Sequence, residues 1–276
     1  MAPEPLGTSS HDGGSHGASS RRALSLSGGS SSSSGAGGFV PRPGKAIQQF
    51  SFVDALVAGL LDGAFPAAAV ASAGTLGVGC GDALDGELVL IDGVLYVCNG
   101  DVRRVLPDAQ LPFAEVVRFE PTFTIAIDTA HGEKQFEELV ESLVPSDNLF
   151  YALRFDGSFS RMTVREAVRQ QRPYPGLADA VRSQHESTVS ATTGTLLGFK
   201  GPDVFQGLSV ADFHLHYISD DRTFGGHSMD FELLSGVLSI EAYASFTVHL
   251  PQVSSYLEAE LDNINADEEI RRAEDS

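Results

Sequence analysis

Short apolar runs, each bounded by residues typical of turns, fill most of the chain between residues 75 and 250. Residues 88–91 and 94–97 flank Asp92 and Gly93, a dipeptide typical of two-residue β-hairpins. We expect a second hairpin where residues 149–155 and 159–164 flank Asp156 and Gly157. Similar runs lie at 116–119 and 123–127, around Glu120 and Pro121, and at 213–218, 229–234, 237–242 and 246–250. Strands this short and this numerous restrict the chain to a sheet-rich fold.

Four segments with helical spacing lie among these strands. They are predicted at 51–61, at 66–74, from Phe136 to a stop at Pro145, and at 177–186. The order of helices and strands predicts an α+β protein with two lobes, each built on a mixed β-sheet with flanking helices. We place these lobes at residues 39–175 and 176–276.

Residues 1–38 are predicted to be a disordered leader. Ser and Gly make up more than half of this segment, so it cannot bury enough apolar surface to offset the entropy lost on ordering. Arg21 and Arg22 are followed by Ala-Leu-Ser-Leu and then by Ser and Gly residues, without the apolar run that a twin-arginine signal needs.

Charge and composition exclude several functions. The chain has 18 Lys and Arg against 37 Asp and Glu, a net charge of −19, which disfavours binding to nucleic acid or to an anionic membrane surface. No apolar run is long enough to predict a membrane-spanning helix. Two cysteines, Cys80 and Cys98, predict free thiols in a reduced compartment, the cytoplasm.

One segment carries a metal-binding pattern. His214 and His216 lie two residues apart on a predicted strand, so both imidazoles point to the same face. His227 follows Gly225 and Gly226, and a hairpin at this loop would return it to the pair. Three imidazoles could hold a divalent metal, with Zn²⁺ as the default, and leave one coordination position open for catalysis. The alternative is a histidine-rich strand that binds no metal.

Several separated segments of the chain resemble the alpha-acetolactate decarboxylase family. The resemblance runs from about Gln49 to the C-terminus. The segments that carry it are residues 84–88 (Leu-Asp-Gly-Glu-Leu), Val164-Arg165 with Arg172-Pro173-Tyr174-Pro175, residues 194–199, and residues 213–227 with the three histidines. Their common order along the chain makes the resemblance more specific than any one motif.

The resemblance implies a zinc-dependent homodimer that converts 2-acetolactate to (R)-acetoin and carbon dioxide, with its metal site in the C-terminal lobe. It implies that His214, His216 and His227 are the zinc ligands and that Glu87 and Arg165 are catalytic. A glutamate of the C-terminal tail also belongs to the family's site. Glu274 matches it best, with Glu269 and Glu268 as alternatives. Cys80 departs from the family, which has Thr at this position, and a thiol is a weaker hydrogen-bonding group than a hydroxyl.

The chemistry of a 2-hydroxy-3-keto acid agrees with these residue types. Zinc chelated by the hydroxyl and carbonyl oxygens would stabilise the enediolate left by decarboxylation, and the guanidinium of Arg165 would hold the carboxylate. Protonation of one face then needs an acid, for which Glu87, Glu274 and a water bound to Arg165 are candidates. Without the family, Glu87 would be an ordinary strand-edge carboxylate, and Arg165 would pair with Glu166 or with another of the many carboxylates. Two further classes stay open: another three-histidine metal enzyme, such as an oxygenase using Asp220 or Asp221, or a hydrolase; and an inactive binding homologue.

Overall fold

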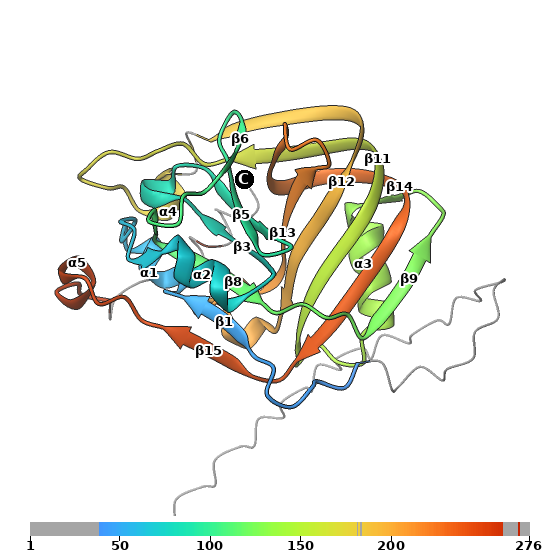
Figure 1. Cartoon of the computed structure of the whole chain (residues 1–276), viewed down its shortest axis with the longest axis horizontal. Helices are drawn as coiled ribbons and strands as arrows, with labels where there is room; N and C mark the ends of the chain where they lie inside the picture. Colours follow the sequence, from blue (N-terminus) through green and yellow to red (C-terminus); the bar gives the residue numbers. More distant parts are fainter. Residues whose placement is uncertain (1–38, 181, 183, 262–269, 271–276) are drawn as a thin grey trace, which may run out of the picture. The chain divides into compact units, whose positions relative to one another are not determined.

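The computed structural model describes residues 39–180, 182, 184–261 and 270 of the chain (Figure 1). The expected leader at residues 1–38 lies outside these residues, as do Glu268, Glu269 and Glu274. The described part is rich in sheet and contains few helices. None of its helices is long and apolar enough to cross a membrane.

Seven strands form the first sheet. In spatial order they are β15 (Phe246–His249), β1 (Ile47–Phe50), β8 (Phe113–Val117), β3 (Leu76–Cys80), β4 (Glu87–Ile91), β5 (Val94–Cys98) and β6 (Val102–Arg104). The β1–β15 pair is parallel and the other pairs are antiparallel, so this sheet is mixed, as expected. The predicted hairpin at Asp92 and Gly93 is confirmed, because it joins β4 to β5.

The second sheet is built from long strands that curve strongly in Figure 1. Its order is β10 (His131–Gly132), β14 (Gly225–Tyr243), β11 (Phe150–Glu166), β12 (His185–Gly201) and β13 (Asp212–Ser219), and β9 (Phe123–Ile127) also pairs with β14. All of its described pairs are antiparallel, so the prediction of a mixed sheet is wrong here. The tight connection from β13 at Ser219 to β14 at Gly225 suits an antiparallel pair, whereas a parallel pair needs a long crossover.

Helices cover the outer faces of the two sheets, and the inner faces pack on each other. Helix α2 (Ala67–Ala73) places Val70 on the outer face of the first sheet, and α3 (Glu133–Leu143) places Phe136 and Val140 on that of the second. The remaining elements are the helices α1 (Val53–Val57), α4 (Leu177–Ala180) and α5 (Ser254–Leu257), the 3₁₀ turns Asp82–Leu84 and Asp203–Phe205, and the paired β2 (Phe65–Pro66) and β7 (Gln110–Leu111). Between the sheets lie Val78 and Val89 of the first and Phe199 of the second.

The hairpin predicted at Asp156 and Gly157 is wrong, because β11 continues through both residues. Gly157 pairs with Gly194 on one side and with Gly236 on the other. A Cβ atom at Gly157 would lie 2.4 Å from the carbonyl oxygen of Ser235. Glycine at this position therefore allows close packing between long strands. Gly236 in the same way divided β14 into two predicted strands, at 229–234 and 237–242.

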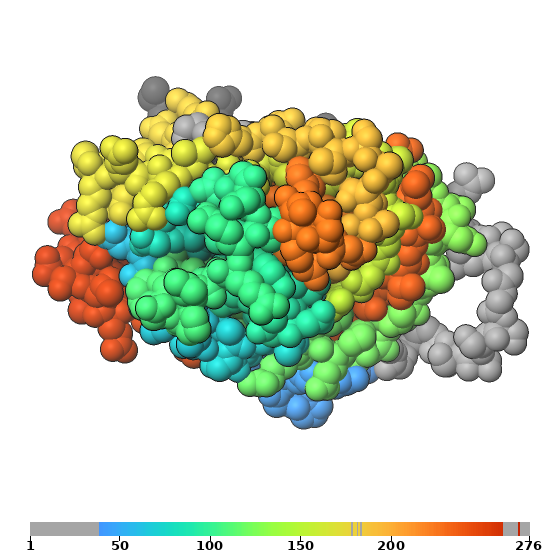
Figure 2. Space-filling view, turned by 45° about the horizontal axis from the view of Figure 1, so that its top comes forward, coloured from blue at the N-terminus to red at the C-terminus, as the bar shows by residue number. Residues whose placement is uncertain are grey.

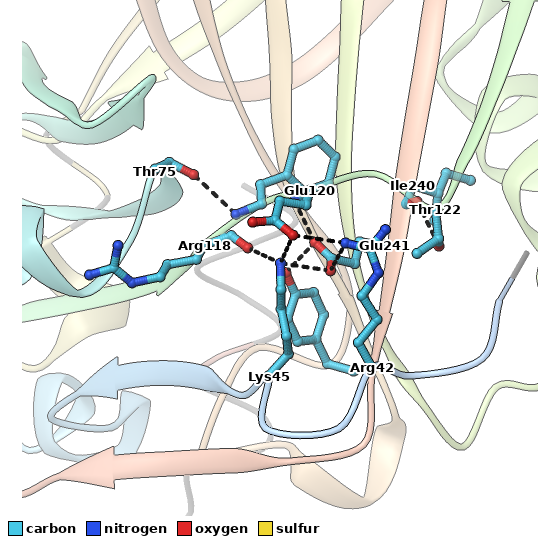
Figure 3. Close-up of polar contacts among 10 residues, drawn as sticks. Arg42, Lys45, Thr75, Arg118, Glu120, Thr122, Ile240 and Glu241 are labelled. Atoms are coloured by element: carbon cyan, nitrogen blue, oxygen red, sulfur yellow. Dashed lines mark hydrogen bonds and ion pairs between the residues drawn. The ribbon is translucent and has the colours of Figure 1, made fainter.

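Glu120 and Pro121 lead the chain from the first sheet to the second rather than through a hairpin, since β8 and β9 belong to different sheets. Glu241 of β14 holds this crossing in place (Figure 3). Its buried carboxylate accepts hydrogen bonds from the Glu120 N–H and the Tyr243 hydroxyl, and it lies 3.1 Å from Lys45 Nζ. The boundary between two lobes at residue 175 stays a prediction, and both sheets draw strands from either side of it.

A second buried carboxylate, Glu115 of β8, has no cation beside it among the described residues. Ser209 donates a hydrogen bond of 2.7 Å to its Oε2, while its Oε1 and the Oε1 of the paired Gln49 have no hydrogen-bond partner in this part of the chain. Burial raises the pKa of Glu115 to about 7. A protonated carboxyl can donate a hydrogen bond where an ionised one cannot, so the neutral form fits this environment better.

We predict that Glu115→Gln stabilises the fold at high pH. The native state keeps a proton on Glu115, whereas the unfolded chain releases it once the pH exceeds the ordinary pKa of 4.5. The free energy of unfolding therefore falls as the pH rises from 4.5 to about 7. The variant stays neutral, and its free energy of unfolding should exceed that of the wild type by about 1–3 kcal/mol at pH 8 and match it at pH 4.5. Urea unfolding at both pH values measures this difference. Glu138→Gln, at an exposed position of α3, is the control, and equal effects of the two substitutions would contradict the prediction.

Candidate metal centre

Three histidines gather where β13 closes back onto β14. His214 and His216 alternate along β13 and so point to the same face, and His216 pairs directly with His227 of β14. The ring centroids lie 5.1–5.3 Å apart, and one ligand nitrogen from each ring lies within 4.8 Å of the others. All three side chains are buried. The hairpin expected at Gly225 and Gly226 thus brings His227 beside the pair.

The two glycines before His227 allow this closure because β14 is crowded there. A Cβ atom at Gly226 would lie 2.5 Å from the carbonyl oxygen of Arg165, and one at Gly225 would lie 2.9 Å from Cys98 Sγ. The loop before them packs against the first sheet, where the guanidinium of Arg222 lies 5.5 Å from the ring centroid of Tyr96. Figure 2 shows this loop, in orange, beside the green residues near position 100.

The first sheet sets the tautomer of His216. Its Nδ1 lies 2.9 Å from the carbonyl oxygen of Leu88 in β4, and a carbonyl only accepts, so Nδ1 carries the proton. The lone pair therefore resides on Nε2, which lies 3.6 Å from Glu87 Oε2. A backbone carbonyl that orients a histidine in this way is common behind metal ligands.

Burial keeps His216 and His227 in the form that binds a metal. Desolvation holds the pKa of His216 well below its ordinary value, and the neighbouring His214 acts in the same direction. Desolvation also lowers the pKa of His227, together with the positive charge of Arg165. Neutral imidazoles offer lone pairs, so the donor set fits a divalent metal ion.

Glu87 and Arg165 reach the same pocket as the histidines from opposite sheets. Glu87 begins β4, and Arg165, at the end of β11, pairs directly with His227. The pocket has a volume of about 60 Å³, and both side chains line it together with His214 and His227. Arg165 is 4% exposed, so its charge faces the pocket rather than solvent. The neighbouring Glu166 accepts a hydrogen bond from the Gly100 N–H.

Apolar side chains close the rest of the pocket, and sequence reasoning missed them. Val53 and Leu56 of α1 and Leu177 of α4 line it, although neither helix carries a sign of function in the sequence. Cys80 lines it too, directly across the strand pair from Glu87, and burial raises the pKa of its thiol. The Leu88 carbonyl was also missed, since a backbone group leaves no mark on residue type.

Comparisons with known proteins agree on one family. The family profile for alpha-acetolactate decarboxylase matches residues 47–263. The alpha-acetolactate decarboxylase of Methylococcus capsulatus is 37% identical over 230 residues, which are 83% of this chain and 88% of that protein. That of Methanosarcina mazei is 35% identical over 83% of this chain and 80% of that protein. The crystal structure of the Bacillus subtilis enzyme superposes with a TM-score of 0.81 at 33% identity, covering 84% of this chain and all of that one.

We predict that the purified chain binds about one zinc ion and that His216→Ala abolishes this binding. The substitution removes the one ring whose donor nitrogen is oriented by Leu88 and leaves only two imidazoles. Metal analysis after dialysis against a slight excess of zinc measures the stoichiometry. His131→Ala, which changes a histidine outside the triad, should keep full binding. Full zinc content in His216→Ala would show that the triad is not the site.

Proposed function

The chain belongs to the alpha-acetolactate decarboxylase family, and from this we propose that it converts 2-acetolactate to (R)-acetoin and carbon dioxide with Zn²⁺ at His214, His216 and His227. The observation that carries the proposal is the pocket that His214, His227, Glu87 and Arg165 line together, with His216 Nε2 3.6 Å from Glu87 Oε2. These residues supply an anchor for a metal, a carboxylate and a guanidinium within one small cavity.

The three histidines would hold the zinc ion and leave a coordination position for the substrate. When bound, zinc supplies a positive charge that polarises the substrate carbonyl and stabilises the negative charge developing on its oxygen. The apolar walls around the pocket strengthen such electrostatic interactions because they keep water away. No organic cofactor is needed, since the carbonyl of the substrate accepts the electron pair released by decarboxylation.

Arg165 would bind the substrate carboxylate. Its guanidinium stays charged and can form two parallel hydrogen bonds with a carboxylate, which fixes the orientation of the carbon–carbon bond that breaks. The charge is buried in the pocket, so it attracts the anionic substrate more strongly than an exposed arginine would. This attraction counts in a chain whose net charge of −19 repels anions.

Glu87 would donate the proton that the substrate carbon takes up after decarboxylation to give acetoin. Its carboxyl is close to His216 and lines the pocket, so it can reach the reacting carbons directly or through one water. A tail glutamate would share this task, with Glu274 as our first choice and Glu269 or Glu268 as alternatives. Support comes from Ile270, which is fully buried in the cluster that contains the pocket residues Leu84 and Val210.

An oxygenase on the same ligands is not favoured. Such an enzyme would add a carboxylate to the metal ligands, and Asp221 instead accepts hydrogen bonds from Ser219 and Thr223 in its own loop.

We also propose that the chain forms a homodimer and that it resides in the cytoplasm. The cytoplasmic location is supported by the two cysteines, which are buried and free.

Acetoin and carbon dioxide formation from racemic acetolactate tests the proposed function. We expect turnover by the zinc-loaded chain, loss of turnover with a chelator, recovery on adding zinc back, and a single acetoin enantiomer on a chiral column. A zinc-loaded chain that releases no carbon dioxide would overturn the proposal.

We predict that Arg165→Ala keeps its zinc but loses about 100-fold or more in kcat/KM, because the carboxylate is no longer oriented. Steady-state kinetics alongside metal analysis separates the two effects. Arg161→Ala is the matched control, since Arg161 lies on the same strand and pairs with Asp230 at the surface. If Arg165→Ala decarboxylates acetolactate within twofold of the wild-type rate, the role given to Arg165 is wrong.

A further inference from the structure

The turn that leads into Glu87 has an unfavourable backbone conformation. Ala83, at φ 56° and ψ 33°, and Leu84, at φ 57°, are both left-handed although neither is glycine. Consecutive non-glycine residues rarely adopt this conformation, and they keep it only where their surroundings impose it. The turn also shapes the site, because Leu84 lines the pocket and Glu87 follows three residues later.

The segment that follows Arg165 is hydrogen-bonded to this turn, as are Leu61, Gly63 and Asn99. The Gly86 N–H donates a hydrogen bond of 3.1 Å to the Ala167 carbonyl, and the Gln170 N–H donates one of 2.7 Å to the Ala83 carbonyl. The two sides of the pocket are thereby joined, since residues just after Arg165 hold the turn just before Glu87. A change in this contact would move one of these side chains relative to the other.

Arg169 supplies the side-chain part of the same contact. Its Nη2 lies 2.8 Å from Asp82 Oδ2, and its Nη1 lies 3.3 Å from Asp85 Oδ2 and 3.4 Å from the Asp82 carbonyl oxygen. One guanidinium thus bridges both ends of the strained turn. The side chain is 53% exposed, and exposed ion pairs contribute little to global stability. Its effect should therefore be local.

We propose that Arg169 is a positioning residue for the decarboxylation: by bridging Asp82 and Asp85 it holds the turn at residues 82–86 and so sets the place of Glu87 in the pocket. The proposal rests on the proposed function for its effect on turnover. Arg169 lines no part of the pocket among the described residues, so it acts through the turn and not on the substrate. A small displacement of Glu87 would matter, since a shift of about 1 Å in a reacting group can lower the rate about 100-fold.

The experiment compares Arg169→Ala with Arg154→Ala. Arg154 bridges two aspartates in the same manner, Asp92 and Asp156, and Asp92 is also left-handed, at φ 51°. That bridge lies at the opposite end of β4 from Glu87, which makes it a matched control. We expect Arg169→Ala to lower kcat about 10-fold or more with little change in KM or melting temperature, and Arg154→Ala to keep kcat within twofold.

A second substitution tests whether the left-handed backbone at Ala83 causes the loss of kcat in Arg169→Ala. Glycine adopts a positive φ without cost, so Ala83→Gly should keep the turn in place without its bridge. The double variant Arg169→Ala/Ala83→Gly should recover at least threefold in kcat over Arg169→Ala. A double variant as slow as Arg169→Ala would overturn the proposal, as would an Arg169→Ala rate within twofold of the wild type.

Hydrogen exchange of residues 81–88 by mass spectrometry provides a readout that needs no substrate. Arg169→Ala should speed exchange there at least fivefold and Arg154→Ala should not. Unchanged exchange in Arg169→Ala would overturn the proposal even where the rate falls. A wild-type chain without decarboxylase activity would overturn the proposed function alone, because the exchange comparison still decides whether Arg169 holds the turn.

Discussion

The hydrogen bond from His216 Nδ1 to the Leu88 carbonyl is the contact on which the site depends. It joins β13 of the second sheet to β4 of the first, and it leaves Nε2 unprotonated toward the pocket. The residue before Leu88 in the same strand is Glu87, so one strand supplies both the group that orients a ligand and a candidate acid. The packing of the two sheets therefore sets both the orientation of His216 and the position of Glu87.

The pocket combines opposite electrostatic needs within a small space. Burial lowers the pKa of His216 and His227 and so favours their neutral forms, while the positive charge of the buried Arg165 lies in the same pocket. An anionic substrate would compensate that charge, and a divalent metal would take up the lone pairs of the histidines.

The sequence predicted those parts of the fold and site that depend on local pattern. Alternation along β13 placed His214 and His216 on one face, and Asp92 with Gly93 marked a true hairpin because the turn is open to solvent. Asp156 with Gly157 has the same dipeptide pattern, but the hairpin predicted there is wrong. Gly157 instead allows the backbone of a neighbouring strand to pass close by. The Leu88 carbonyl and the bridge made by Arg169 depend on contacts between distant segments, which no local pattern encodes.

X-ray absorption at the zinc edge of the zinc-loaded chain shows whether His214, His216 and His227 bind the metal together. We expect three imidazole nitrogens at about 2.0–2.1 Å, with oxygen completing the coordination. A sulfur ligand at about 2.3 Å, which would implicate Cys80 of the pocket or Cys98, or fewer than three imidazoles, would contradict this arrangement.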